Sequence, residues 1–399
     1  MAMANIEDKH TYLVAARRTP IGAYLGALSS RTAPQLGSVA IRAALESARL
    51  GSEQIDEVYM GNVLSAGIGQ APARQAALGA EIPNTVPTTT VSKVCGSGLQ
   101  AVILGHRAIA VGDADTVVAG GMECMSQTPH YLMQSRTGLR LGNGQLLDGM
   151  MHDGLWDPYH DYPMGKAAEL CARKYDFSRE AQDAFAKESY FRALAAQRTG
   201  AFDDEIAAVA VPQRKGDAMI VALDEEPGRG QPEKFAKLRP AFDEQGTITA
   251  ANASSINDGA AAVILASGAA VKKYELAPMA RIVSTGAAAH APEWFTTAPA
   301  KAIEAALNKA RLKTEEIDLW EINEAFSCVT MACCQLAGVD ADRVNVHGGA
   351  VALGHPIGAS GARILTTLVH ALRRHDKQRG LATLCIGGGE AVATVIERI

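Results

Sequence analysis

Apolar and polar positions repeat along this chain in two similar stretches. Residues 40–56, "AIRAALESARLGSEQID", and residues 302–318, "AIEAALNKARLKTEEID", both place apolar residues at helical spacing. Aligned without a gap at an offset of 262, eleven of the seventeen positions are identical. Each stretch continues into Ile-Asp and an apolar segment, so the pattern predicts an amphipathic helix followed by a strand in both places.

A second pair of stretches follows in the same order. Residues 116–123, "TVVAGGME", match residues 383–390, "TLCIGGGE", at an offset of 267, and both indicate a buried strand that runs into a glycine turn. Two matches at nearly the same offset predict a duplicated α/β unit, with a mostly parallel sheet in each copy.

The segment between the copies has a different pattern. Residues 124–250 are richer in charged residues and are interrupted by proline and glycine. One long helix is predicted over residues 179–199, with Ser178 as N-cap and Gly200 at its end. The residues that we expect on its buried face are Ala184, Phe191 and Ala195.

These patterns predict three parts. Residues 1–123 form a first half, residues 124–250 an inserted loop domain, and residues 251–399 a second half. Alternatively, part of residues 251–275 belongs to the first half and completes it.

Composition narrows the functional class. The chain is 48% hydrophobic and 20% charged, with a net charge of −5, so a nucleic-acid partner is not expected. No apolar run reaches the roughly 18 residues of a membrane span, and the start "MAMANIEDKH" resembles neither a signal nor a transit peptide. Seven scattered cysteines form no disulfide framework and lack zinc spacing. We therefore expect a cytoplasmic protein without a membrane partner or a metal.

The two copies differ where chemistry is expected. Cys385 stands opposite Val118 at the second offset, and Asn323 opposite Gly61 at the first. Cys95, carried across, falls near position 357, beside His355. Buried polar replacements are common, but several on matching elements of one pair indicate a site.

Cys95 lies in "SKVCGSGLQAVILG", between a β-branched, strand-like stretch and a helical one. A thiol at a helix N-terminus has a lowered pKa, so we expect the nucleophilic thiolate. His355, between Gly354 and Pro356, is the candidate base, and Asn323 could hold a water or donate to an oxyanion. A second thiol, Cys385, could move a proton at carbon. The set indicates acyl transfer coupled to carbon–carbon bond making or breaking.

The motifs "VCGSG", "NEAF", "GHPIGASG" and "CIGGG", in this order, resemble the thiolases, and the resemblance covers essentially the whole chain, including "KLRPAFD" and "NASSINDGAA". It implies an α/β fold of the duplicated thiolase type, five-layered α/β/α/β/α, with an inserted loop domain that binds coenzyme A.

The resemblance also implies residue roles. Cys95 is acylated, His355 activates it, and Cys385 exchanges the proton on the acetyl α-carbon. Asn323, through a water, completes one oxyanion hole with His355, and the backbone N–H groups of Cys95 and Gly387 make the other.

Substrate contacts follow from the same resemblance. The residues implied in coenzyme A binding are Ser254, Ala250, Phe242, Leu155 and Met164, and those at the acyl pocket are Phe326 and Phe295. Arg214, Lys215 and Lys234 are candidates for the nucleotide phosphates, although a solvated charge cluster is the commoner reading.

Several positions depart from the family pattern. Pro163 stands where short-chain members tend to carry histidine, Ser255 replaces a glycine, and Phe295 stands where methionine is expected. Glu390 follows "CIGGG", and its counterpart at the second offset, Glu123, suggests a structural role for both.

The predicted reaction is the reversible condensation of two acetyl-CoA to acetoacetyl-CoA and CoA through an acetyl-cysteine, as in fatty acid metabolism. The alternative is a degradative 3-ketoacyl-CoA thiolase acting on longer or branched chains. A ketoacyl-carrier-protein synthase would have a second histidine in place of Cys385. A non-catalytic acyl-CoA binder would lack Cys95 or His355, and a redox or metal protein would show a C-x-x-C pair. We expect no permanently bound cofactor, coenzyme A as substrate and product, and a homotetramer built as a dimer of dimers.

Overall fold

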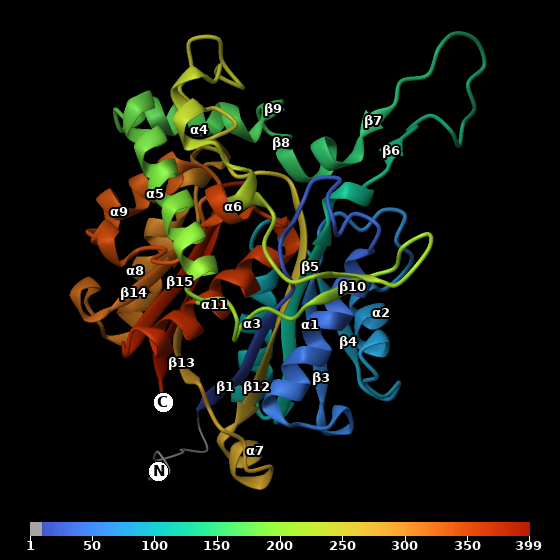
Figure 1. Ribbon diagram of the computed structural model, residues 1–399, viewed down its shortest axis with the longest axis vertical. Coiled ribbons are helices and arrows are strands. Elements are labelled where there is room, and N and C mark those ends of the chain that lie inside the picture. The colour runs from blue at the N-terminus through green and yellow to red at the C-terminus, as the bar shows by residue number, and fades with distance from the viewer. Residues whose placement is uncertain (1–9) are drawn as a thin grey trace.

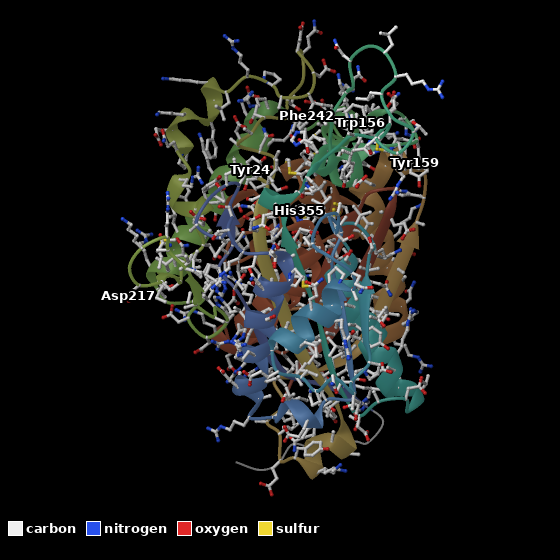
Figure 2. All side chains as sticks on the ribbon, turned by 90° about the vertical axis from the view of Figure 1, so that its right-hand side faces the viewer. Tyr24, Trp156, Tyr159, Asp217, Phe242 and His355 are labelled. Atoms are coloured by element: carbon white, nitrogen blue, oxygen red, sulfur yellow. The ribbon has the colours of Figure 1, made fainter. Side chains whose placement is uncertain are left out.

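The computed structural model describes residues 10–399 and consists of two α/β halves, with a segment of loops, short strands and helices that covers their top and one side (Figures 1 and 2). The first half is blue to teal in Figure 1, apart from its gold strand β12, and the second half is orange to red. The main elements of the first half are β1 (Thr11–Arg18), α1 (Ala33–Ala48), β3 (Glu57–Gly61), α2 (Pro72–Gly79), β4 (Thr88–Val91), α3 (Ser97–Val111), β5 (Thr116–Cys124) and β12 (Asn257–Ser267). Those of the second half are β13 (Ala280–Ala289), α8 (Ala298–Ala310), β14 (Leu319–Ile322), α9 (Ser327–Ala337), α10 (Ala350–Leu353), α11 (Ile357–Arg374), β15 (Arg379–Ile386) and β16 (Glu390–Arg398).

The upper segment follows β5. It contains α4 (Met164–Lys174), α5 (Arg179–Arg198), α6 (Glu226–Arg229) and three two-stranded pairs. The pairs are β6 (His130–Tyr131) with β7 (Leu147–Asp148), β8 (Trp156–Asp157) with β9 (Tyr162–Pro163), and β10 (Val209–Val211) with β11 (Met219–Val221). The remaining strand and α-helix within residues 10–399 are β2 (Gly22–Ala23) and α7 (Gly268–Lys273).

The repeated helices occupy equivalent places. α1 and α8 start before the repeated stretches, and both end at an arginine in the left-handed conformation, Arg49 and Arg311, with φ of 54° and 55°. The two C-caps are 262 residues apart, which is the offset found in the sequence. Thr32 starts α1 with a capping box that Gln35 completes. The first repeat therefore predicts correctly the paired helices and the strands β3 and β14 that follow them.

The strands form one continuous mixed sheet in the order β14-β15-β16-β13-β1-β12-β5-β3-β4, with β2 beside β12. Only β3–β4, β3–β5 and β14–β15 are parallel, so the expectation of a mostly parallel sheet is wrong. Each half contains antiparallel pairs because of its last strand. β15 turns directly into β16 as a hairpin, and β12 returns antiparallel between β1 and β5. The two halves join where Tyr12 and Leu13 pair with Arg281 and Ala280.

The helices and strands form five layers, and three apolar cores hold these layers together. α1 and α2 pack on one face of the first half's strands, through Val118 and Met122 of β5. α3 and α11 pack between the two halves, through Val117 and Ala119 of the same strand. α8 and α9 cover the outer face of the second half, where Cys385 lies. Because neighbouring residues of a strand point to opposite faces, β5 is buried on both sides. The layers are α/β/α/β/α, as in the duplicated fold that the motifs imply.

α3 belongs to this central layer. The window Val94–Val111 is apolar and long enough to span a membrane by length and composition alone, and half of it is buried inside the protein. Gly98 brings its first turn close to α11, since a Cβ there would lie 2.8 Å from the Ala362 nitrogen and 3.1 Å from the Gly358 carbonyl oxygen. The burial and the close packing are those of a core helix.

α5 agrees with the sequence in its ends but not in its buried face. Ser178 accepts a hydrogen bond from the Ala181 N–H at 3.1 Å and caps the helix, as expected. Phe191, however, is exposed, and Ser189 is buried because its hydroxyl donates to the carboxylate of Glu324 at 2.7 Å. The face that meets the second half is thus partly polar. The residues that bury it are Gln182, Asp183, Ala186, Ser189, Tyr190, Ala193 and Ala196, rather than Ala184, Phe191 and Ala195.

A buried ion cluster ties β1 to the loops above it. The Arg18 guanidinium lies 2.6 Å from Glu205 Oε1 and 2.7 Å from Asp224 Oδ1, and all three side chains are fully buried. We expect Arg18→Met to lower the free energy of unfolding by about 3 kcal/mol, because two buried carboxylates lose their partner. The urea unfolding midpoint measures this loss.

The control for this variant is Arg42→Met, because Arg42 is exposed and donates only to the Gly79 carbonyl. Its unfolding midpoint should stay close to that of the parent protein. Equal midpoints for the Arg18 variant and the parent would contradict the prediction.

Candidate active site

Cys95 lies in the tight turn between β4 and α3. Val94, just before it, has a φ of 44°, which is unusual for a β-branched residue and indicates local strain. The Ser97 hydroxyl ties the turn together, since it accepts from the Lys93 N–H at 2.8 Å and donates to the Val94 carbonyl at 2.7 Å. The Cys95 side chain is half-buried and lines a cavity.

The environment raises the pKa of Cys95 to about 11, mainly because burial disfavours the thiolate. Its own backbone N–H and that of Gly387 lower the pKa, but by less than burial raises it. The expected lowering by the helix N-terminus is wrong for a local reason. The N–H groups of Gly96 and Ser97 donate to the carbonyls of Lys93 and Val94 within the turn, so they are already occupied. Cys95 therefore needs a base.

His355 stands before α11, after Gly354, whose φ of 104° and close contact with the Asn257 side chain both favour glycine. Its Nδ1 lies 2.6 Å from the Ser360 hydroxyl, which itself donates to the Pro356 carbonyl at 2.9 Å. The proton between them therefore belongs to Nδ1, and Nε2 keeps a lone pair. Within residues 10–399 no group hydrogen-bonds to this buried Nε2. Burial, and to a lesser degree the charge of Arg363, lowers the pKa of His355 to about 3, so the ring is neutral.

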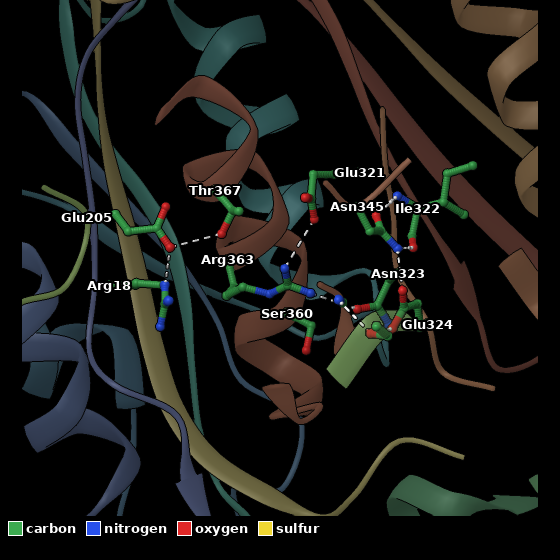
Figure 3. Close-up of polar contacts among 12 residues, drawn as sticks. Arg18, Glu205, Glu321, Ile322, Asn323, Glu324, Asn345, Ser360, Arg363 and Thr367 are labelled. Carbon is green, nitrogen blue, oxygen red and sulfur yellow. Dashed lines mark hydrogen bonds and ion pairs between the residues drawn. The ribbon is translucent and has the colours of Figure 1, made fainter. Parts of the chain in front are cut away.

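Asn323 lies behind His355, not on the cavity wall. Its Nδ2 is 3.4 Å from His355 Nδ1. Its Oδ1 accepts from Arg363 at 3.4 Å, as Figure 3 shows. Arg363, on α11, also lies 3.2 Å from Glu321, and both side chains are buried. Burial raises the pKa of Glu321 to about 8, while the Arg363 charge opposes that rise. This network fixes Asn323 beside the histidine.

Cys385 is fully buried near the end of β15. Burial, and to a lesser degree the charge of Cys95, raises its pKa well above the usual value. Gly387 follows two residues later, at the hairpin turn, and lines the same cavity as Cys95. The structure thus brings together the four side chains that the sequence singled out, from four separate segments.

A cavity of about 290 Å³ opens above Cys95 and His355. Phe242, Trp156 and Tyr159 lie at the upper end of the protein, above His355 (Figure 2). The predicted site residues that line this cavity are Cys95, Leu155, Met164, Phe242, Ser254, Phe295, Phe326, His355 and Gly387. Ala250 is exposed and is not among the lining residues, and Cys385 and Asn323 lie behind the wall.

Part of the wall was not anticipated. Met125, Met151, Ile256 and Ile357 also line the cavity, and Met125 and Ile357 belong to a small apolar cluster packed against Cys95. The methionines and glycines between residues 133 and 165 were the only sequence signal for this side. Such residues line pockets and fill cores alike, so the pattern could not assign them.

Comparisons with known proteins agree with this geometry. The family profile described as "Thiolase, N-terminal domain" matches residues 11–269, and "Thiolase, C-terminal domain" matches residues 276–398. The chain belongs to the thiolase family.

Relatives match this thiolase over its whole length. An "Acetyl-CoA acetyltransferase" of Schizosaccharomyces pombe is 49% identical over 398 residues and covers 100% of both chains. Another of that name, from Cupriavidus necator, is 51% identical over 387 residues, covering 97% of this chain and 98% of the relative. The solved structure of "Acat5 thiolase from Ascaris suum in complex with coenzyme A" matches with a TM-score of 0.93 at 46% identity, over 98% of this chain and 100% of that one.

The register of the thiolase sheet corrects one sequence comparison. Glu57 of β3 pairs with Val117 of β5, whereas Leu319 of β14 pairs with Gly380 of β15. With Glu57 and Leu319 as counterparts, Val117 corresponds to Gly380 and Cys385 to Met122 rather than Val118. Glu390 is likewise not the counterpart of Glu123, and the strand β5 runs through its two glycines without turning.

Glu123 nevertheless has a structural place in this thiolase. Its buried carboxylate accepts from the N–H groups of Val63, Leu64 and Gly358 at 3.0, 3.2 and 3.0 Å. Burial raises its pKa to about 7 despite these donors. Glu123 thus fastens the start of α11, next to His355, to the first half.

The basic residues considered for phosphates lie away from the cavity. Arg214 and Lys215 are exposed in the loop between β10 and β11, and Figure 2 shows Asp217 of that loop well below Phe242. Lys234 is also exposed and does not line the cavity. Over residues 10–399, no three His, Cys, Asp or Glu side chains are grouped so as to hold a metal ion. All seven cysteines are free.

Proposed function

We propose that this thiolase condenses two acetyl-CoA to acetoacetyl-CoA and CoA, and catalyses the reverse thiolysis, through an acetyl group on Cys95. The observation that carries the proposal is the shared cavity, in which a neutral His355 presents a free Nε2 lone pair and Cys95 presents a protonated thiol. The relatives named acetyl-CoA acetyltransferase, about half identical over the full chain, support the acetyl group as the group transferred.

Acylation starts with proton transfer from the Cys95 thiol to His355 Nε2. The sulfur forms a bond to the thioester carbonyl carbon of acetyl-CoA, and the bond from that carbon to the CoA sulfur breaks. The leaving CoA thiolate takes a proton from Cys385, which becomes a thiolate, while His355 keeps the proton on Nε2.

The negative oxygen of each tetrahedral intermediate needs donors. We propose the N–H groups of Cys95 and Gly387 for one oxygen, since they approach the sulfur from two different turns. For the other we propose His355 together with Asn323. Asn323 lies behind the wall, which is consistent with action through a bound water rather than by direct contact.

Carbon–carbon bond formation then uses Cys385. Its thiolate removes a proton from the methyl carbon of a second acetyl-CoA, and the resulting carbanion attacks the acetyl carbon on Cys95. The new carbon–carbon bond forms as the carbon–sulfur bond to Cys95 breaks, and the Cys95 sulfur takes its proton back from His355. The strongly raised pKa of Cys385 suits this task, because only a weak acid has a conjugate base strong enough to remove a proton from carbon.

Coenzyme A enters and leaves as substrate and product in this proposal, with no permanently bound cofactor. Leu155, Met164 and Phe242 of the upper segment, with Ser254 just after it, line the upper part of the cavity. We propose residues 124–250 as the loop domain that binds coenzyme A, between halves at 1–123 and 251–399, with β12 completing the sheet of the first half. The Ascaris suum neighbour, solved with coenzyme A, supports coenzyme A as the ligand.

Three aromatic side chains restrict the acyl pocket. Phe326 packs edge-on against Phe242 and Phe295, with ring centroids 6.2 and 6.4 Å apart, and Pro163 lies on the same wall. We expect CoA-dependent cleavage of 3-ketoacyl-CoA to be fastest with four carbons. Phe295→Ala should raise the kcat/KM for a six-carbon substrate, relative to four carbons, by about tenfold.

The chain-length series from four to sixteen carbons tests both statements. Tyr159→Ala is the matched aromatic control, because the exposed Tyr159 does not line the cavity. A maximum at longer or branched chains in the parent enzyme would identify a degradative thiolase instead. No turnover at any length would overturn the proposed function.

We also propose a homotetramer, arranged as a dimer of dimers, in the cytoplasm. A long loop between β6 and β7 projects from the body (Figure 1). Its exposed apolar side chains are Met133, Leu139, Leu141 and Leu146, and Leu141 is fully exposed. Such side chains are typical of an interface between subunits. Light scattering should report four chain masses, and a mass of one chain would contradict the proposal.

A further inference from the structure

An ion pair joins the two turns that meet at the reactive cysteine. Lys93 Nζ contacts Glu390 Oε2, although the two residues are 297 positions apart. Lys93 lies two residues before Cys95, and Glu390 lies three residues after Gly387. The side chains are 28% and 39% exposed, so the pair sits at the edge of the site. Glu390 is one of the positions at which this chain departs from the family pattern.

Each partner is anchored on a constrained backbone. Lys93 precedes Val94, whose positive φ is held by the hydrogen bonds of the Ser97 hydroxyl. Glu390 starts β16 and pairs with both Ile386 and Ala289, directly after Gly388 and Gly389, whose φ values are 88° and 85°. The pair therefore connects two rigid turns rather than two loose ends.

The two turns approach each other closely at glycines. Gly96 lies against Ile386, because a Cβ at Gly96 would be 2.3 Å from Ile386 Cδ1. Gly387 faces Val94, with 3.5 Å from a built Cβ to Val94 Cγ1. Glycines on both sides allow the close approach, but they contribute no side chain to hold it.

The distance between the turns matters for the proposed chemistry. The backbone N–H of Cys95 belongs to the first turn and that of Gly387 to the second, and the same thioester oxygen must accept from both. Donors of this kind must be placed within about 0.5 Å of their productive positions. A small displacement of one turn would weaken one of the two hydrogen bonds in the transition state.

We propose that Lys93 and Glu390 are positioning residues, which clamp the Cys95 turn to the Gly387 turn and so set the spacing of the two N–H donors. This inference rests on the proposed function for the role of the donors, but not for the clamp itself. Neither side chain lines the substrate cavity, so both act through the backbone.

The kinetic test uses Lys93→Met, Glu390→Gln, the double variant and the exchanged pair Lys93→Glu with Glu390→Lys. We expect each single variant to lower kcat of acetoacetyl-CoA thiolysis about fivefold, with KM for CoA within about twofold of the parent, since a half-exposed ion pair contributes up to ~1 kcal/mol. The double variant should be no slower than either single one, and the exchanged pair should recover most of kcat.

A second readout does not depend on turnover. The Gly387 N–H lowers the pKa of the Cys95 thiol, so a displaced turn should move the pH dependence of Cys95 alkylation by iodoacetamide to higher pH. The other titratable groups near the Cys95 sulfur are Glu123, Cys385 and His355, and all variants leave them in place.

The two single variants distinguish a clamp from a simple charge effect. Removing Lys93 takes away a positive charge, and removing Glu390 takes away a negative one. Through-space electrostatics would therefore shift the alkylation profile in opposite directions, whereas loss of the clamp shifts both toward higher pH.

The control is Arg281→Met, because Arg281 forms a comparable, partly exposed ion pair with Glu397 near the other end of β16. It should change neither kcat nor the alkylation profile. Opposite shifts in the two single variants, unchanged kcat in either, or additive losses in the double variant would overturn the clamp. If the parent enzyme turns over no 3-ketoacyl-CoA, the proposed function fails, and the alkylation profiles still decide the inference.

Discussion

A Cys95→Ala enzyme should lose kcat for acetoacetyl-CoA thiolysis by about 10⁵-fold, close to the uncatalysed background. No other thiol can replace it in the cavity, because Cys385 lies behind the wall and its raised pKa keeps it protonated. Binding of CoA should be preserved, since the cavity loses only one sulfur atom. Steady-state kinetics and equilibrium binding of CoA measure the two effects separately.

The matched control is Cys334→Ala, because Cys334 is half-buried on α9 and does not line the cavity. This variant should keep the kcat of the parent. Mass spectrometry after mixing with acetyl-CoA should find one acetyl group, on the peptide that contains Cys95. Acetylation of any other residue, or substantial activity without Cys95, would contradict the mechanism.

His355→Ala should lower kcat by about 10⁴-fold, because it removes both the base and one of the proposed oxyanion donors. The effect should also appear in the alkylation of Cys95. With a pKa of about 3, His355 stays neutral above about pH 4 and accepts the thiol proton throughout the neutral range. Without it, the alkylation rate at neutral pH should fall steeply, because only the small fraction of Cys95 that is already a thiolate can react.

His130→Ala is the control for this variant, since His130 is exposed on β6, away from the cavity. It should leave both kcat and the alkylation profile unchanged. A His355 variant that alkylates at the parent's rate at neutral pH would show that Cys95 ionises without this base.

The sequence predicts the duplicated framework because the repeat records it directly. Apolar residues at helical spacing identify α1 and α8, and the shared Arg-Leu marks the left-handed caps at Arg49 and Arg311. The pattern of apolar residues does not show strand direction, so it could not predict that the sheet is mixed. It also placed Phe191 in a core, whereas α5 buries Ser189 against Glu324.

The glycines explain why the second repeat was aligned four residues out of register. Gly120 and Gly121 lie inside β5, where a Cβ would be 2.2 Å from the Ala261 carbonyl and 2.1 Å from the Gly358 carbonyl. Gly388 and Gly389 form a hairpin turn with positive φ. Glycine serves close packing in one place and backbone conformation in the other, and the letters alone do not distinguish the two.

The candidate site was predicted unevenly. Motifs name the four reactive side chains, and the structure brings them together. The ionisation of Cys95 depends on burial and on which N–H groups are already occupied, and neither can be read from the sequence. The methionines of the upper segment join the cavity wall only through tertiary packing.

The two central helices place different reactive residues on equivalent turns of the two halves. Cys95 lies before α3 and His355 before α11, and the first turns of these helices meet at Gly98 and Gly358. A half-chain that paired with a copy of itself would carry the same residues on both turns. Because the two copies are joined in one chain, each turn carries its own residues, so the proposed nucleophile stands before one helix and the proposed base before the other.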